Sequence, residues 1–210
     1  GNIQMQDGDR INWSKAVTRS ESLRFGAALD TLVLDFGLPR LSANLTENLI
    51  LRELKIMGDE SAEGRLRLNG NSVLIQENMS VTDLSLSSAQ VAELVVGGDL
   101  ELNRAGLTEN IRATVVGAST IEGTLNNLSF STYGVLRLLS RTFAPQSLRF
   151  IGSHQQWTLP GDLTLSSLIV SQDAPGWLDV TAANDNAVVR VSGGTQLNGG
   201  RVRSNTVLFA

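Results

Sequence analysis

The chain has 210 residues, of which 41% are hydrophobic but only 5% aromatic, and its formal net charge is −4. This length suits one ordinary domain with a core of Leu, Val and Ile, and the mild charge without any run of Lys or Arg argues against a nucleic-acid partner. The absence of cysteine excludes disulfides and thiolate metal sites.

The first twenty residues differ from the rest of the chain. Residues 3–6 are typical of one strand, residues 7–9 of a turn, and Ser14 of the N-cap of a short helix. A coil of strands needs its open end covered, because an exposed apolar layer and a free strand edge invite aggregation. We therefore expect residues 1–20 to form an N-terminal cap and residues 21–210 to form a β-solenoid domain.

From residue 21 onward, short segments recur in which apolar and polar residues alternate, and this pattern predicts strands with one buried face. The clearest are Leu54–Ile56, Leu66–Leu68, Leu84–Leu86, Leu94–Val96, Leu100–Leu102, Leu163–Leu165 and Val189–Val191. Aligned with one another, they indicate units of 26–32 residues, each with about three strands. The sequence thus predicts an all-β, single-domain parallel β-helix of about six three-strand rungs, and a β-sandwich is the alternative. Four residues are expected to stack in one column, namely Leu54, Leu84, Ile111 and Leu136.

Small and polar residues separate these strands, as the corners of a coil require. The alternation lapses at residues 59–63, 140–145 and 173–176, where we expect protruding loops that are natural places for function. The chain ends on an apolar strand, Val207–Phe209, without a cap. This edge predicts either a continuing coil or end-to-end pairing with another chain through Val207, Leu208 and Phe209.

Carboxylates are the first candidates for chemistry, because glycoside hydrolysis needs two acids at a suitable separation. The acids in or beside expected strands are Asp83, Glu93, Asp99, Glu101 and Asp179. Asp99 and Glu101 are two residues apart, so on one strand both point to the side opposite Leu100 and Leu102. They form the candidate catalytic pair, although outward acids are also ordinary on a solvated sheet.

Exposed aromatic rings are the second candidates, because they can stack on sugar rings. Trp177 follows a turn and is the better candidate for an exposed ring, whereas Trp157 alternates with Leu159 and is also consistent with an inward position. The only histidine, His154, has no G-x-S-x-G motif to partner it, so a hydrolytic triad is not predicted. Without cysteine and with one histidine, we expect no metal site and no cofactor.

Two stretches share a G-D-L-x-L pattern, in residues 93–103 and 160–165. This pattern resembles the rungs of secreted parallel β-helix proteins, including haemagglutinin-type bacterial adhesins. The resemblance implies a coil on a bacterial cell surface or in the secreted space, and it carries over no functional residue.

The favoured functional hypothesis is a non-enzymatic, extracytoplasmic β-solenoid of bacterial origin that acts as a structural or adhesive module. Its expected partner is a protein or a carbohydrate at a cell surface. One alternative is a carbohydrate-active enzyme that uses outward carboxylates, and another is a scaffold that polymerises end to end. No apolar run approaches the roughly 20 residues of a membrane-spanning helix. The first residue is Gly1 and not Met, so an upstream signal peptide or anchor is expected to have been removed.

Overall fold

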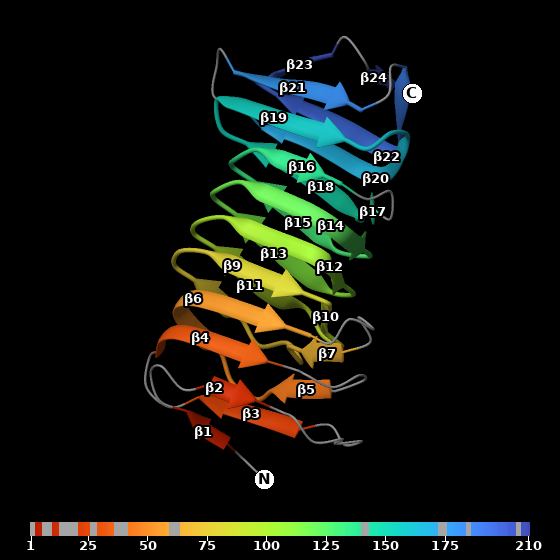
Figure 1. Ribbon diagram of the computed structural model, residues 1–210. Helices are drawn as coiled ribbons and strands as arrows, with labels where there is room; N and C mark the ends of the chain where they lie inside the picture. The colour runs from red at the N-terminus through yellow and green to blue at the C-terminus, as the bar shows by residue number, and fades with distance from the viewer. Residues whose placement is uncertain are drawn as a thin grey trace.

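A computed structural model shows the strands of this chain wound into a coil, with the N-terminus at one end and the C-terminus at the other (Figure 1). The structure describes residues 3–5, 10–12, 21–25, 29–35, 42–58, 64–139, 143–171, 176–183, 186–204 and 207–210. These residues form 24 strands, and every pair of neighbouring strands among them is parallel, apart from one isolated antiparallel bridge. The parallel β-helix is confirmed. The sandwich alternative is wrong, because sandwich strands joined by hairpins pair antiparallel.

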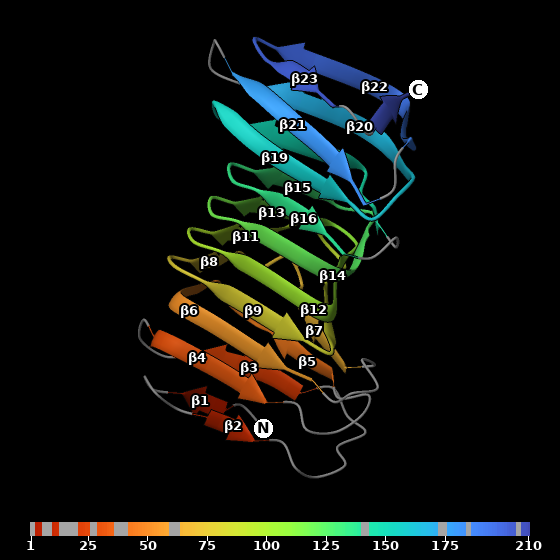
Figure 2. The same ribbon diagram turned by 45° about the horizontal axis from the view of Figure 1, so that its top comes forward.

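Each turn of the coil contributes strands to three sheet faces, which the two views in Figures 1 and 2 display as stacked rungs. In chain order, the turn that contains β7, β8 and β9 defines face 1, face 2 and face 3. Face 1 contains β1 (Ile3–Met5), β3 (Glu21–Phe25), β5 (Ser42–Leu45), β7 (Gly64–Arg67), β10 (Leu84–Ser87), β17 (Phe143–Ala144) and β24 (Val207–Phe209). Face 2 contains β8 (Val73–Ile75), β11 (Ala92–Val96), β13 (Ile111–Val115), β15 (Ser129–Thr132) and β18 (Ser147–Ile151).

Face 3 contains β2 (Arg10–Asn12), β9 (Met79–Thr82), β16 (Leu136–Leu138), β19 (His154–Leu159), β21 (Trp177–Ala182) and β23 (Arg201–Arg203). The longest strands bend around a corner and serve two faces. These are β4 (Leu29–Asp35), β6 (Leu49–Met57), β12 (Leu100–Thr108), β14 (Ser119–Asn126), β20 (Leu163–Ser171) and β22 (Ala187–Asn198). A bulge in β12 between Asn103 and Ala105 makes one of these bends.

Most turns are shorter than the 26–32 residues expected from the sequence, and the turn from β20 to β22 falls within that range, with Leu163 paired to Val189, 26 residues later. On face 3, Leu54 pairs with Met79, 25 residues later, and Ser119 pairs with Leu136, 17 residues later. The inward column on this face runs through Leu32, Leu54, Met79, Leu100, Ser119, Leu136, Trp157 and Val180. The expected repeat was too long because each aligned unit included residues that belong to the following turn.

The expected four-residue column is therefore wrong in part. Leu54 and Leu136 share the column on face 3, but Leu84 lies on face 1 and Ile111 on face 2. All four side chains are buried, so the alternation identified inward residues correctly. Which of the three faces a residue occupies depends on the number of corner residues in each turn, and that number varies.

The core is a continuous aliphatic stack, as the composition predicted. Both apolar residues of almost every expected triplet are buried, and strands such as β7, β8 and β16 show strict buried–exposed alternation. Among the side chains whose burial the structure describes, large rings enter the core in the C-terminal half, where Phe150 and Trp157 pack with ring centroids 5.2 Å apart. Burial of apolar area on this scale is the main stabilising contribution to the fold.

The G-D-L-x-L pattern has a structural explanation in the corners. Asp99 Oδ1 accepts a hydrogen bond from the backbone N–H of Ala118 (2.7 Å), and Asp162 Oδ1 accepts one from Val188 (2.9 Å). In each case the aspartate precedes a strand, and the donor lies one turn later, at the matching corner. The carboxylate thus satisfies a backbone donor that the sheet ladder leaves unpaired.

Another corner holds a buried ion pair between successive turns. Asp83 is buried and receives two hydrogen bonds of 2.7 Å from Arg104, one turn later. Both residues have a positive φ, 55° for Asp83 and 48° for Arg104, where the chain turns sharply. The bidentate pair compensates for the desolvation of the carboxylate at this bend.

At the N-terminal end, β1 pairs with β3 and β2 pairs with β4, so both short strands join the coil. The helix expected after Ser14 lies outside the described residues, as do residues 59–63, 140–142 and 173–175, while the rest of the loop expected at 140–145 contains the short strand β17. The boundary between a cap and a solenoid at residue 20 stays a prediction. The described residues contain no helix, and so none long and apolar enough to cross a membrane.

Candidate binding site

The acids predicted from the sequence, Asp99 and Glu101, lie on the outer surface of face 3. Both side chains are exposed, while Leu100 and Leu102 between and beside them are buried, as the alternation predicted. The structure adds Glu53 and Lys55 from β6, two turns earlier, to the same surface. Together these residues line part of a shallow hollow of ≈ 360 Å³.

Asp99 has a structural role in this hollow. Its Oδ1 atom accepts the hydrogen bond from Ala118, and its own backbone N–H donates to Asn78 Oδ1 (2.9 Å). The chain Asn78–Asp99–Ala118 therefore ties three successive turns together at one corner. A carboxylate held in this way is an acceptor for a fixed N–H group, which explains the presence of Asp99 without catalysis.

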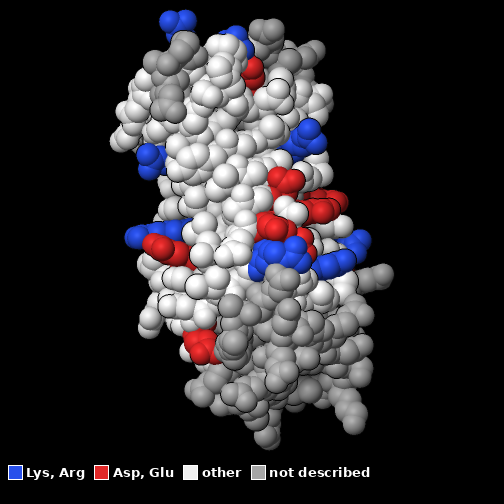
Figure 3. All heavy atoms as spheres, turned by 90° about the vertical axis from the view of Figure 1, so that its left-hand side faces the viewer, with Lys and Arg blue, Asp and Glu red and all other residues white. Residues whose placement is uncertain are grey.

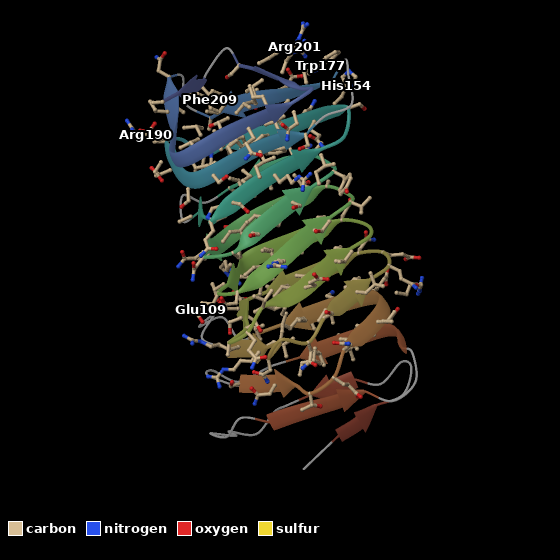
Figure 4. All side chains as sticks on the ribbon, turned by 180° about the vertical axis from the view of Figure 1, so that it is seen from behind. Glu109, His154, Trp177, Arg190, Arg201 and Phe209 are labelled. Atoms are coloured by element: carbon tan, nitrogen blue, oxygen red, sulfur yellow. The ribbon has the colours of Figure 1, made fainter. Side chains whose placement is uncertain are left out.

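The two tryptophans have different environments. Trp157 is fully buried in the core column of face 3, which confirms its inward alternative and removes it as a ring for ligands. Trp177 lies at the start of β21, is half-buried, and points away from the core at the C-terminal end of face 3 (Figure 4). Only Trp177 can contact a ligand on the surface.

Trp177 is the centre of a cluster that the sequence did not reveal, formed with His154, Asp179 and Arg203. The His154 ring packs edge-on to the Trp177 ring, with centroids 3.8 Å apart, and the Arg203 guanidinium carbon lies 4.2 Å from the Trp177 ring centroid. The indole N–H of Trp177 donates a hydrogen bond to Asp179 (3.2 Å). The ring is thus held in place by its neighbours and is not an open platform for stacking.

Strand register assembles this cluster from three turns. His154 pairs with Trp177 between β19 and β21, and Asp179 pairs with Arg203 between β21 and β23. Trp177 and Asp179 are two residues apart on one strand, so both project outward. The sequence predicted Asp179 as an acid in or beside a strand. Its neighbours Arg203 and His154 lie 24 and 25 residues away in the chain, so only the register between strands places them beside it.

Asp179 and Arg203 form a planar, bidentate ion pair. Arg203 Nε donates to Oδ1 (2.8 Å) and Nη2 donates to Oδ2 (2.9 Å). The hydrogen bonds from Arg203 hold the pKa of Asp179 below its usual range; burial opposes this shift, whereas the charge of Arg203 and the bond from Trp177 add to it. Asp179 is therefore negatively charged at neutral pH, and Arg203 is fixed against it.

The cluster borders the larger hollow of the described surface, ≈ 680 Å³ in volume. Its wall is formed by side chains from β19, β21 and the end of β23: Gln156, Thr158, Asp179, Val180, Thr181, Arg203 and Ser204. Thr158 and Thr181 lie on adjacent strands with their hydroxyl oxygens 3.4 Å apart. Amide, hydroxyl, carboxylate and guanidinium groups thus surround one open depression.

The face drawn in Figure 3 carries charged side chains of both signs. In the view of Figure 3, acidic and basic side chains mix at mid-height and neither sign dominates a large area. Among the residues that the structure describes, no group of three or more metal-ligating side chains converges. We therefore take the Trp177–Asp179–Arg203 cluster, with His154 and the adjoining hollow, as the candidate site.

Comparison with protein-family models, curated proteins and solved structures gave no match to this chain. The resemblance to haemagglutinin-type adhesins stays a prediction.

Proposed function

We propose that this protein is a non-enzymatic, extracytoplasmic β-solenoid that acts as an adhesive module of a bacterial surface. In this role the coil is a rigid scaffold, and the hollow on face 3 binds a partner, either a carbohydrate or a protein at a cell surface. The observation that carries the proposal is the fixed Trp177–Asp179–Arg203 cluster beside the ≈ 680 Å³ hollow.

The organisation of the cluster favours binding over a purely structural role. An exposed ion pair on a sheet contributes little to stability, about 0–1 kcal/mol. Here one such pair is also oriented by an indole ring and by an indole N–H, and it lies at the edge of a depression. Preorganised polar groups of this kind lower the entropic cost of binding a ligand.

The enzymatic alternative rests on the hollow that contains Glu53, Asp99 and Glu101. Glycosidases need one carboxyl group as a proton donor and a second as base or nucleophile. Asp99 is tied to the Ala118 N–H, so the corner already explains this carboxylate, and binding is the better proposal. We expect the wild-type protein to release no reducing ends from polysaccharides. Glu101→Gln should therefore give the same result as the wild type in this assay.

Binding is tested with the purified chain on a panel of immobilised surface polysaccharides and surface proteins. We expect the double variant Asp179→Ala/Arg203→Ala to lose at least tenfold in affinity for the bound partner, because it removes the cluster at the hollow. The matched control is Arg52→Ala/Glu77→Ala, which removes an exposed ion pair (3.5 Å) elsewhere on the coil. Equal binding by the wild type and the cluster variant would contradict the proposal.

A further inference from the structure

We propose that the ≈ 680 Å³ hollow on face 3 binds a carboxylated glycan, which is a chain containing uronic or other acidic sugars. In this proposal Arg201 and Arg203 recognise its carboxylate groups. This inference rests on the proposed binding function and specifies the chemistry of the partner.

The local charge around the hollow is positive although the whole chain is acidic. Strands β19, β21 and β23 contain one acid, Asp179, against Arg201, Arg203 and His154. Asp179 is neutralised by its ion pair with Arg203, so Arg201 adds an uncompensated positive charge to these three strands. A region of this kind attracts an anionic ligand, in contrast to the −4 net charge of the protein.

The two arginines are placed on one side of β23. Arg201 and Arg203 are both exposed, while Val202 between them packs against the core. Arg201 is the register partner of Trp177, and Figure 4 shows it extending at the C-terminal end beside that ring. Arg203 lines the hollow, and Arg201, two residues earlier on the outer side of the same strand, lies beyond its lining.

Arg203 has donor capacity left for a ligand. Its ion pair with Asp179 uses Nε and Nη2, so the Nη1 group is not part of that bidentate contact. Stacking on Trp177 fixes the plane of the guanidinium. A planar guanidinium in a fixed orientation is well suited to a carboxylate, which it can bind through two parallel hydrogen bonds when a second donor is near.

The rest of the lining matches sugar hydroxyl groups. Gln156, Thr158, Thr181 and Ser204 provide amide and hydroxyl groups that can both donate and accept hydrogen bonds. They come from adjacent parallel strands, whose spacing of about 4.8 Å is close to the length of one sugar unit in an extended chain. A glycan that crosses the strands meets Gln156 and Thr158 on β19, then Thr181 on β21, and then Ser204 after β23.

This combination favours an acidic glycan over an acidic peptide. Every lining residue except Val180 is polar, and the hollow is open, without the apolar pockets that anchor peptide side chains. A glycan instead presents many hydroxyl groups, which fit the Thr, Gln and Ser side chains, together with carboxylates that fit the arginines.

The test compares an alginate oligosaccharide, which carries a carboxylate on every sugar, with the same oligosaccharide after reduction of its carboxyl groups. Binding to the full chain is measured by calorimetry at low and at moderate salt. We expect the acidic form to bind at least tenfold more tightly, because its carboxylates accept charge-assisted hydrogen bonds from the arginines and the reduced form has no such groups. We also expect the affinity to fall as salt is raised.

Variants locate the interaction. Arg201→Gln should weaken alginate binding about tenfold without changing the thermal midpoint, since Arg201 makes no side-chain contact to the described residues that supports the fold. Arg112→Gln, an exposed arginine on face 2, is the matched control and should bind as the wild type does. Unchanged binding by Arg201→Gln would overturn the inference.

The outcomes separate this inference from the proposed function. Equal affinity for the acidic and the reduced oligosaccharide overturns carboxylate recognition but leaves a glycan-binding module. Binding only to an acidic peptide from the panel of surface proteins overturns the glycan and leaves an adhesive role. Failure to bind any member of the panel contradicts both.

Discussion

Ser119 and Ser88 are both buried serines of the coil, but the structure gives a hydrogen-bond partner to only one hydroxyl group. Ser88 Oγ accepts a hydrogen bond from the backbone N–H of Gly70 (2.9 Å), whereas Ser119 Oγ is buried in the face 3 column without a partner. A buried polar group without a partner loses its hydration and gains nothing in return. These two residues therefore allow a direct test of polar burial in this core.

We expect Ser119→Ala to raise the free energy of unfolding by about 1 kcal/mol, because it removes an unsatisfied hydroxyl from the core. Ser88→Ala should lower it by about 1 kcal/mol, because it leaves the Gly70 N–H unpaired. Urea unfolding followed by circular dichroism measures both. Destabilisation by Ser119→Ala would show that its hydroxyl is in fact satisfied, for example by a buried water.

Asp179 makes the stability of the C-terminal end depend on pH. Its folded-state pKa is below the usual value of 3.8, so the ion pair with Arg203 stabilises the fold above that pH and is lost as pH falls through the lowered pKa. We expect wild type to exceed Asp179→Asn in unfolding free energy at pH 7 by at most about 1 kcal/mol, since the pair is partly exposed. The difference should shrink as the pH falls below 3.8 and vanish once the pH lies below the lowered pKa of Asp179.

Thermal midpoints of both proteins between pH 2 and pH 7 provide the measurement. A constant difference over the whole range would mean that the charge of Asp179 does not contribute, and that the substitution acts through packing alone.

At the scale of the strand, β22 shows how closely neighbouring turns approach. Gly193 and Gly194 are adjacent in sequence, but a Cβ atom on Gly193 would lie 2.3 Å from the backbone oxygen of Ser166, while a Cβ atom on Gly194 would meet nothing within 4 Å. The close approach coincides with the irregular register of β20 and β22 between Leu165 and Ser167. Only one of these two glycines is required by packing.

We expect Gly193→Ala to lower the free energy of unfolding by about 1–3 kcal/mol, because the contact is with a backbone atom and the strand must shift. Gly194→Ala should change it by no more than about 1 kcal/mol and is the matched control. Urea titration of both variants measures the two changes in the free energy of unfolding. Equal effects would indicate that the strands relax without cost at this bulge.

For the whole molecule, the C-terminal end of the coil is an open end of the core. Leu197 pairs with the buried Val170, so it lies in an inward column, yet it is 53% exposed, and Phe209 on β24 is 41% exposed. Among the described strands, β23 and β24 each pair on one side only. The expected self-association through Val207, Leu208 and Phe209 stays a prediction, and the side chain of Leu208 lies outside the described residues.

We expect the chain to associate as its concentration is raised, through pairing of this edge with a second copy. Light scattering over a range of concentrations measures the mass. The variant Leu197→Lys/Phe209→Lys should remain monomeric, whereas Leu139→Lys, at a leucine that is 56% exposed in mid-coil, should associate as the wild type does. A wild-type monomer at high concentration would contradict end-to-end assembly.

The local alternation of residues was sufficient to predict the fold class, because a strand with one buried face repeats every second residue whatever its neighbours are. It identified Leu54, Leu84, Ile111 and Leu136 as core, and it placed Asp99 and Glu101 outside. It failed on the length of a turn, because corners of variable length contain no periodic signal. The column through Met79, Ser119 and Trp157 was therefore not predictable.

The candidate site illustrates the same limit. The sequence predicted Asp179 as an acid in or beside a strand and Trp177 as an exposed ring, but nothing local connects them with His154 and Arg203. Their contacts depend on the register between successive turns, and register is set by the corner lengths and by bonds such as that of Asp162 to Val188. The sequence by itself determined that this protein is a coil with an aliphatic core. Only the tertiary structure decided which side chains meet on its surface, since parallel strands bring together residues that are a whole turn apart.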